Sequence, residues 1–465
     1  MFNMYNFPYS FFIAQKIAII LNKKLIEEWY FMLIFAGILF TLFILVFSVL
    51  NDIFLGYGLT SSLLFFTFIG IKKGYSLKKI IDLYWTETKK SLNIILILVL
   101  IGMLISSWLS CGTIPSIIYY SLKYLNPNLF ILSAFLITSL ISMLIGTSFG
   151  TVSAVGIPLI IIGRAAGINL NILGGAIFSG AYLGDRSSPL SSSLLLLCNL
   201  TDVELFGYAK KLLIDNIIPI VLCVGFYLIF SLKYPLSFVD NKLNVEIYNY
   251  FNVSIILLLP AVILFALSMF KVKITYSIPV SVLCAFVLDI VVQGNGVGDF
   301  VKSLVFGYSN DSEVLKSIIH GGGIISMLKT CYIIIISCSL SGFFSGLNVF
   351  DSLKQKLKEK NLSKASLFLV TFGLATINAA IGCSQTIAII LTLDIVKELY
   401  EDYGKEELSL DISNSAILTP ALIPWCIAAL VPCSILGIGS YGYIVFAFYL
   451  YIVPVVHYFR RRFVG

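Results

Sequence analysis

Apolar residues along this chain come in runs about as long as a membrane is thick. They include Tyr30–Leu50, Asn93–Leu109, Leu129–Ile145, Val253–Phe270 and Tyr441–Val456. Each run approaches or reaches the roughly 20 residues with which a helix spans a bilayer, and we distinguish about eleven to thirteen hydrophobic elements in all. The pattern predicts an all-α polytopic membrane protein, because a helix satisfies its own backbone hydrogen bonds inside hydrocarbon.

Several apolar elements are too short, or too rich in Gly, Pro and Ser, to be plain spans. These elements are Thr113–Leu125, Gly150–Gly163, Val297–Gly307 and Asn378–Ile390. Broken helices and re-entrant hairpins are the expected structures, since irregular backbone is tolerated at membrane depth only where protein or a water-filled cavity surrounds it.

The chain is expected to form one transmembrane domain, at 30–465, preceded by an interfacial segment at 1–29. That segment has an apolar patch followed by lysines, which is typical of a helix lying on a membrane surface. Within the domain, a polar connection separates two related halves, roughly 54–232 and 250–456.

Interruptions of the apolar pattern recur at corresponding places in the two halves. In the first half, a break at Gly146 precedes Pro189 by 43 residues. In the second half, a break at Gly382 precedes Pro424 by 42 residues, with Pro420 shortly before it. Repeated breaks of this kind are typical of transporters built from two inverted repeats, so we expect these five residues to mark hinges or helix breaks.

Composition agrees with a protein embedded in a lipid bilayer. Hydrophobic residues make up 59% of the 465 residues, charged residues make up 12%, and the mean hydropathy is +0.98. A soluble domain has about 25% charged residues.

The net charge of +7 does not indicate binding to nucleic acid, because the basic residues lie between the apolar runs. The positive-inside rule places such segments in the cytoplasm, so both termini are predicted to be cytoplasmic. The main basic segments are Lys72–Lys79, Lys354–Lys364 and Arg460–Arg462.

Disulfide, metal, cofactor and enzyme chemistry are not expected. The nine cysteines form no C-x-x-C pair, and there are only two histidines. No Walker loop is present, which argues against ATP-driven pumping.

Two segments resemble hydrolase motifs. Gly146–Gly150 matches the G-x-S-x-G of hydrolases and His320–Gly323 resembles an oxyanion motif. In hydrolases, however, the oxyanion element precedes the nucleophile on soluble strand–turn–helix units.

The segment Gly184–Leu190 carries the most informative chemistry. It places the carboxylate of Asp185, the guanidinium of Arg186 and the helix-breaking Pro189 between apolar runs. Ionisable groups at membrane depth cost about 2.5–3.5 kcal/mol each on insertion scales. Burial favours a neutral Asp185, whereas a cation or Arg186 favours an ionised one, so the group can alternate between a proton and a cation. The alternative is an Asp–Arg pair at the membrane interface.

Hydroxyl and amide side chains gather around the breaks in both halves. Such groups suit a small cation or a carboxylate, although small residues also serve helix packing in membranes. The candidate ligands are Thr147, Ser148, Thr151, Ser188 and Ser192 in the first half, and Ser384, Gln385 and Thr386 in the second.

Five motifs, in order over roughly residues 60–440, resemble those of the NhaC family of antiporters. They correspond to the family's W-x-x-x-G-T-x-P, G-T-S-x-G-T-x-x-x-x-G, S-G-A-Y-x-G-D-x-x-S-P-L-S, G-G-x-x-S-M and P-L-I-P-W elements. The matching segments are Trp108–Pro115, Leu144–Gly156, Ser179–Ser191, His320–Met327 and Leu418–Trp425.

The resemblance implies a secondary transporter of the bacterial inner membrane with inverted repeats. Members of the family exchange protons for sodium, or for paired ions and carboxylic acids such as malate and lactate. This chain has Ser192 where the family usually has Asp, and Cys426 where it usually has Asn. Both changes remove an oxygen ligand that suits sodium, so the identity of the transported ion stays open.

Lys329 is a second candidate for the coupling group, next to Asp185. It is an isolated cation in the apolar run 324–344. Because the chain lacks two family oxygen ligands, we expect that the Lys329 ammonium stands where sodium would bind and either titrates or holds a substrate carboxylate. The alternative is a lysine that reaches from the helix to the membrane surface.

The sequence therefore predicts a secondary active antiporter that works by alternating access. The leading hypothesis is exchange of protons for sodium or another monovalent cation. The alternative is proton-coupled transport of a small carboxylate or amino acid without sodium. A gated channel fits the paired breaks less well, and the sequence leaves a homodimer open.

Overall fold

The computed structural model describes residues 32–51, 53–124, 127–236, 247–270, 272–309, 320–346 and 362–463. Over these residues the chain is helical, with one isolated β-bridge between Tyr308 and Gly321 and no longer strand. The prediction of an all-α protein is therefore confirmed. The interfacial segment expected at 1–29 lies outside the described residues.

Short connections join the helices that precede residue 236. In chain order they are Met32–Leu50, α2 (Leu55–Lys72), α3 (Leu77–Ser110), α4 (Thr113–Tyr124), the 3-10 turn η1 (Pro127–Leu129), α5 (Phe130–Ile145), α6 (Ser148–Thr151), the π-helical turn η2 (Val152–Gly156), α7 (Ile157–Ala165), α8 (Leu170–Ser187), α9 (Ser192–Thr201), α10 (Leu205–Asp215) and α11 (Ile217–Lys233).

A second series follows from residue 255. It consists of η3 (Ile255–Leu258), α13 (Leu259–Met269), α14 (Ile274–Leu288), the π-helical turn η4 (Asp289–Gln293), α15 (Val297–Phe306), α16 (Ile324–Gly346), α18 (Lys364–Gly382), α19 (Gln385–Val396), η6 (Lys397–Tyr400), α20 (Lys405–Ser413), η7 (Thr419–Leu422), α21 (Ile427–Leu436), η8 (Ile444–Phe446) and α22 (Phe448–Phe463).

Among the described residues, seven helices are long and apolar enough to cross a membrane. One of them, Ser148–Ala165, is α6, η2 and α7 read as one span. A broken span is added by Leu170–Thr201 and Leu205–Asp215, between which the helix direction turns by 119°. Four apolar helices of 10–17 residues are shorter. The seven spans, the broken span and the four shorter helices agree in number with the eleven to thirteen hydrophobic elements predicted from the sequence. The 119° bend falls at residues 202–204, where the sequence predicts no break.

Polar residues fix where several helices begin. Ser76, Asn169, Ser191 and Ser363 are the N-caps of α3, α8, α9 and α18, and each side chain accepts a hydrogen bond from a backbone N–H two or three residues later. A side-chain cap of this kind contributes about 1 kcal/mol. It also satisfies a donor that water cannot reach inside a bilayer.

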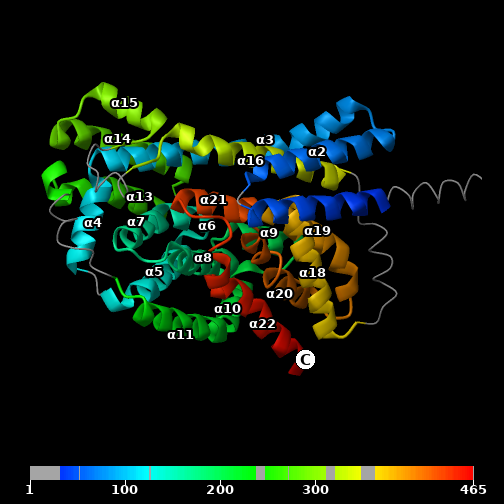
Figure 1. Ribbon diagram of the computed structural model, residues 1–465. Helices are drawn as coiled ribbons and strands as arrows, with labels where there is room; N and C mark the ends of the chain where they lie inside the picture. The colour runs from blue at the N-terminus through cyan, green and yellow to red at the C-terminus, as the bar shows by residue number, and fades with distance from the viewer. Residues whose placement is uncertain are drawn as a thin grey trace, which may run out of the picture.

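The helices form two groups with α21 between them (Figure 1). Helices α2, α14, α15 and α16 all contact the long helix α3 and form the upper layer of the view. Helices α5, α8, α11 and α22 contact one another in the lower group. Helix α21 touches α3 and α16 on one side and α8 on the other, so the centre of the molecule is where elements from both halves meet.

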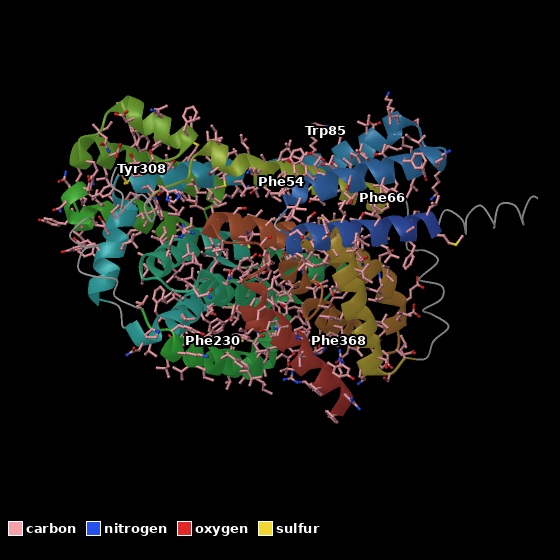
Figure 2. All side chains as sticks on the ribbon, viewed as in Figure 1. Phe54, Phe66, Trp85, Phe230, Tyr308 and Phe368 are labelled. Carbon is pink, nitrogen blue, oxygen red and sulfur yellow. The ribbon has the colours of Figure 1, made fainter. Side chains whose placement is uncertain are left out.

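Large apolar side chains cover the outside of the molecule (Figure 2). Phe43, Ile255 and Phe270 are 71%, 72% and 80% exposed, and Trp85 projects from the upper layer. A soluble protein rarely exposes so much contiguous apolar surface. The surface is therefore that of a multi-pass membrane protein whose outer side chains face lipid.

A buried ionic cluster fixes the last helix to the bundle. Asp411 of α20 is buried and accepts hydrogen bonds from Tyr400 Oη at 2.6 Å and from Arg461 Nη2 at 2.6 Å, and it pairs with His457 Nε2 at 2.7 Å. Glu407, one turn earlier on α20, also pairs with Arg461. Helix α22 thus depends on a carboxylate from α20.

Replacing Asp411 with Ala should lower the free energy of unfolding by about 3–5 kcal/mol, because it removes the buried carboxylate to which Arg461, His457 and Tyr400 all bond. The measurement is thermal unfolding of the purified protein in detergent. The control is Glu406→Ala, which removes the exposed pair with Lys211 and should cost at most about 1 kcal/mol. Equal losses for the two variants would contradict this assignment.

Candidate functional site

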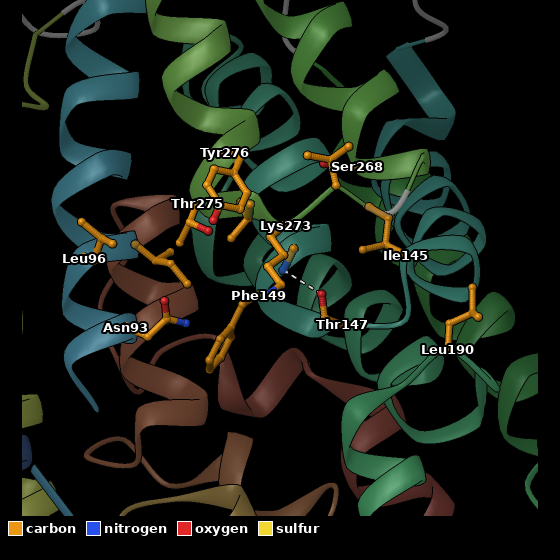
Figure 3. A pocket seen from close by; sticks show the side chains of 14 residues that line it. Asn93, Leu96, Ile145, Thr147, Phe149, Leu190, Ser268, Lys273, Thr275 and Tyr276 are labelled. Atoms are coloured by element: carbon orange, nitrogen blue, oxygen red, sulfur yellow. Dashed lines mark hydrogen bonds between the residues drawn. The ribbon is translucent and has the colours of Figure 1, made fainter. Parts of the chain in front are cut away.

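A two-residue break separates α5 from α6. Gly146 has φ 78° and ψ 8°, the left-handed conformation that favours glycine, and Thr147 is extended. A Cβ atom on Gly146 would lie 2.5 Å from the carbonyl carbon of Leu190. Thr147 then caps α6, and its Oγ1 accepts a hydrogen bond of 3.2 Å from the Gly150 N–H (Figure 3).

A break of the same shape separates α18 from α19. Cys383 is left-handed, with φ 50° and ψ 17°, and Ser384 is extended. The sequence predicts this break at Gly382, but Gly382 is the last residue of α18 and the backbone turns one residue later. A left-handed residue with a side chain costs roughly 1–2 kcal/mol, so the surrounding contacts must hold Cys383 in place.

The hydrogen bonds around the two breaks are equivalent. Ser188 Oγ donates to the Met143 carbonyl at 2.8 Å, and Trp425 Nε1 donates to the Ala380 carbonyl, also at 2.8 Å. Both donors follow their acceptors by 45 residues, and each residue of the second pair lies 237 positions after its counterpart. The bonds satisfy carbonyls near the ends of α5 and α18, which a broken helix leaves without intrahelical partners.

Asp185 lies in the last turn of α8 and is 2% exposed. Its Oδ2 accepts a hydrogen bond of 2.9 Å from Gln385 Nε2. Ser191 Oγ lies 3.3 Å from Oδ1, and Ser193 Oγ lies 3.3 and 3.4 Å from the two carboxyl oxygens. Ser148 also lies beside the carboxyl group. Hydroxyl and amide groups from three segments therefore surround this carboxyl.

The two breaks converge on Asp185. Ser148 is the first residue of α6 and Gln385 is the first residue of α19, so they occupy equivalent places in the two halves. Gln385 is fixed further by a 2.8 Å bond from Nε2 to the Ile417 carbonyl and a 3.2 Å bond from Ser193 to its Oε1. Two helix N-termini, each with a partial positive charge, thus begin beside one buried carboxyl.

Arg186 is buried as deeply as Asp185 but does not pair with it. Its Nε donates to Asn414 Oδ1 at 2.9 Å and its Nη1 donates to Asn216 Oδ1 at 2.5 Å, with Tyr449 Oη 3.4 Å away. Its hydrogen-bond partners in the described structure are uncharged. An Asp–Arg ion pair is therefore not what holds this segment.

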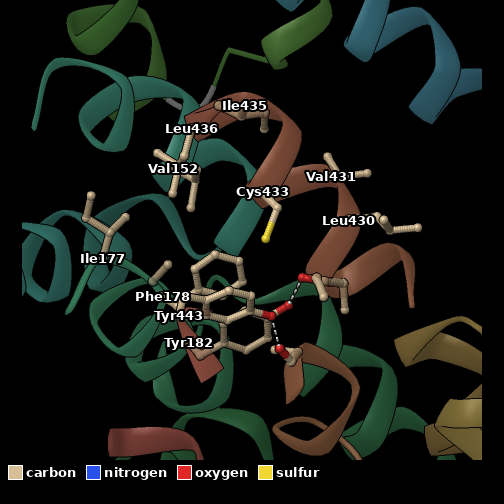
Figure 4. Close-up of a cluster of buried hydrophobic side chains, with 14 of the residues drawn as sticks. Val152, Ile177, Phe178, Tyr182, Leu430, Val431, Cys433, Ile435, Leu436 and Tyr443 are labelled. Atoms are coloured by element: carbon tan, nitrogen blue, oxygen red, sulfur yellow. Dashed lines mark hydrogen bonds between the residues drawn. The ribbon is translucent and has the colours of Figure 1, made fainter. Parts of the chain in front are cut away.

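Aromatic side chains of α8 pack against residues of the second half (Figure 4). Tyr182, one turn before Asp185, donates a 2.8 Å hydrogen bond to the Ala428 carbonyl of α21. The ring of Phe178 stacks on Tyr443 with 3.9 Å between centroids. These contacts tie α8 to the second half of the chain.

The other predicted ligands have different surroundings. Thr151 is buried, and its Oγ1 bonds to the Thr147 carbonyl at 2.8 Å. Ser384 and Thr386 line a separate cavity. Ser192 is exposed and is not among the side chains bonded to Asp185. Lys329 is exposed on α16, so the structure does not bring it to the carboxyl.

The predicted breaks at the prolines lie close to helix ends. Pro189 lies between α8 and α9. Pro420 lies in η7 and Pro424 in the turn that precedes α21. Their role as hinges stays a prediction.

The sequence did not single out Ser191 or Ser193. A serine after a proline and before an apolar run is the pattern of an N-cap, and Ser191 is indeed the N-cap of α9. As the N-cap, Ser191 lies beside the last turn of α8, where Asp185 is. The spacing of the motifs alone does not reveal this contact. Asn216 and Asn414, which hold Arg186, lie 30 and 228 residues from it and carry no local signal.

Among the described residues, no three His, Cys, Asp or Glu side chains form a group that could hold a transition-metal ion. The oxygen atoms around Asp185 are hard ligands, and they suit a proton or a small monovalent cation.

Comparison with known proteins agrees with this chemistry. Residues 7–203 and 180–458 match the Na+/H+ antiporter family. The chain is 30% identical over 415 residues to the malate-2H(+)/Na(+)-lactate antiporter of Bacillus subtilis, covering 88% of this chain and 89% of that protein.

Two further relatives differ in what their names say they exchange. The Na(+)/H(+) antiporter NhaC of Alkalihalophilus pseudofirmus is 29% identical over 368 residues, covering 77% of this chain and 79% of that protein. The arginine/ornithine antiporter ArcD of Halobacterium salinarum is 26% identical over 394 residues, covering 82% of this chain and 81% of that protein.

Replacing Gly146 with Ala should destabilise the protein at this break. The new Cβ would lie 2.5 Å from the Leu190 backbone, and residue 146 would keep a left-handed conformation that disfavours alanine. We expect a loss of at least about 2 kcal/mol, seen as a lower unfolding temperature in detergent and less protein in the membrane. Gly298→Ala is the control, since nothing lies within 4 Å of its Cβ position. Equal behaviour of the two variants would contradict the strained geometry.

Proposed function

The chain belongs to the Na+/H+ antiporter family, and from this premise we propose that Asp185 is the carboxyl group that carries a proton in one direction and a monovalent cation in the other. The observation that supports this role is the convergence of two half-helices on one buried carboxyl, through Ser148 and Gln385. A protein of this family is an antiporter, and a secondary active transporter needs one site that two substrates occupy in turn.

The protonated state requires only the groups already in contact. A neutral Asp185 can donate its proton to Gln385 Oε1 if the amide of Gln385 rotates, because the amide oxygen and nitrogen exchange donor and acceptor roles. A neutral carboxyl group avoids the large cost of a buried, unpaired charge. The partial positive charges of the two helix N-termini beside Asp185 also lower the free-energy cost of its ionised state.

The cation-bound state uses oxygen atoms of the same residues. An ionised Asp185, the hydroxyl oxygens of Ser191 and Ser193, the Ile417 carbonyl and Gln385 Oε1 supply ligands for sodium or another monovalent cation. Proton and cation thus compete for one carboxyl group, which is the condition for exchange rather than cotransport.

We propose that the two halves are inverted repeats and that each break closes the site toward one side of the membrane. The equivalent hydrogen bonds around the breaks support the repeat. We place the protein in the bacterial inner membrane with both termini in the cytoplasm, in agreement with the basic segments between its spans. All residues of the proposed site come from one chain, so a homodimer is not needed for the chemistry.

Replacing Asp185 with Asn should abolish exchange, since an amide cannot bind a proton reversibly at neutral pH. The measurement is proton flux in liposomes that contain the purified protein and a trapped pH dye, after a sodium, lithium or potassium gradient is imposed. Ser192→Ala is the matched control, because Ser192 is exposed on the neighbouring helix, and it should retain flux.

Two outcomes would contradict this assignment. Cation-driven proton flux that persists in Asp185→Asn would remove Asp185 from the coupling step. Loss of pH-dependent transport in Lys329→Met, with Asp185→Asn still active, would transfer the coupling role to Lys329.

Replacing Gln385 with Ala should raise the cation concentration for half-maximal exchange by about tenfold to a hundredfold, because it removes a hydrogen bond to a charged group worth about 1.5–3 kcal/mol. The same liposome assay gives this concentration. Thr386→Ala is the control: Thr386 follows Gln385 directly but is exposed. An unchanged concentration dependence in Gln385→Ala would exclude the amide as a ligand.

A further inference from the structure

A cavity of about 810 Å³ lies beside the first helix break (Figure 3). Its wall comes from α3, from the end of α5 and start of α6, and from the beginning of α14. Polar groups on the wall include Asn93, Thr147, Lys273 and Thr275. A volume of this size, with mixed apolar and polar walls, is typical of sites for small organic molecules. None of the groups that we place around Asp185 is among its lining residues.

The charge on the cavity wall has one sign. Lys273 is exposed and is the only side chain charged at neutral pH among the lining residues, all of which the structure describes. Two helices also begin there: α14, whose N-cap is Lys273, and the span Ser148–Ala165, whose N-cap is Thr147. Lys273 makes no side-chain cap hydrogen bond to α14. A lysine and two helix N-termini favour a negatively charged ligand.

The second break has an equivalent cavity with a different charge. It measures about 370 Å³ and is lined by Ser384, Thr386, Ile387 and Ile427, each 237 positions after a residue that lines the first cavity. Its side chain that is charged at neutral pH is Glu87 of α3, and no lysine or arginine is among the residues that line it. The repeat thus supplies an internal comparison, and only the cavity at the first break suits an anion.

The first cavity adjoins the proposed coupling site. Thr147 on its wall directly precedes Ser148, which lies beside Asp185. Leu190, on the same wall, lies between Pro189 and Ser191 and packs against Gly146. A ligand that fills the cavity therefore touches the break that positions the coupling carboxyl group.

We infer that this cavity is a binding site for the carboxylate of a small organic acid, with Lys273 as the ionic anchor and the hydroxyl groups of Thr147 and Thr275 as hydrogen-bond donors. The inference rests on the proposed function, to which it adds the substrate class. The carboxylate is the group that a hydroxy acid and an amino acid share. An exchange that moves an organic anion together with protons or a cation also reduces the charge that crosses the membrane.

The test is saturation binding of radiolabelled L-malate, L-lactate and L-arginine to the purified full-length protein in detergent. At least one of these carboxylates should bind, and Lys273→Gln should raise its dissociation constant by about tenfold to a hundredfold. Lys273→Arg should restore most of the affinity, because it keeps the charge. Lys210→Gln, on the exposed face of α10, is the matched control and should bind as the unaltered protein does.

Three results would overturn the inference. In the first, the unaltered protein binds none of the three compounds. In the second, Lys273→Gln binds as tightly as Lys210→Gln while remaining folded by size-exclusion chromatography. In the third, the Lys273 effect appears only when phosphatidylglycerol is added to the detergent, which would make Lys273 a contact for lipid phosphate.

Failure of this inference is distinguishable from failure of the proposed function. An unaltered protein that exchanges sodium for protons but binds no carboxylate contradicts only the former, and one that binds a carboxylate but shows no cation–proton exchange contradicts only the latter.

Discussion

The need to satisfy every backbone group inside the bilayer is the constraint on which this structure depends. A helix that breaks at membrane depth leaves carbonyl groups that water cannot reach. Ser188 and Trp425 bond to such carbonyls at Met143 and Ala380. These bonds join each break to the segment that begins α9 or α21. The position of the Asp185 carboxyl group follows, because it lies in the turn of α8 directly before Ser188.

Two neighbouring ionisable residues on α8 have separate surroundings, and the separation matters for function. Successive side chains on a helix point about 100° apart, so Asp185 faces the breaks while Arg186 faces Asn216 and Asn414. Amide and hydroxyl groups stabilise the guanidinium. The carboxyl group is therefore not held in an ion pair and stays available to a proton or a cation. Asn414 is the C-cap of α20 and follows Asp411 by three residues, which links this polar region to the last helix.

The two halves have the same helix break, a left-handed residue followed by an extended one, with different side chains. At equivalent places the first half has Gly146 and Ser148, and the second has Cys383 and Gln385. The breaks give both halves a helix that starts at the central carboxyl group, and a cavity beside it. The side chains give the two cavities opposite charges: Lys273 lines the cavity at the first break, and Glu87 lines the cavity at the second. The two breaks thus share a backbone geometry, and the cavities beside them differ in charge.

The amino-acid sequence by itself determines the membrane class, the number of hydrophobic elements, the places of the breaks to within a residue, and Asp185 as the central carboxyl group. Desolvation of backbone and charge is so costly in a bilayer that composition and spacing reveal them. Only the tertiary structure decides that Ser193 rather than Ser192 meets Asp185, and that Lys329 faces outward. The partner Gln385 lies 200 residues away. Which face of a helix points inward depends on where its cap starts it and on what packs against it, and neither is written in the local sequence.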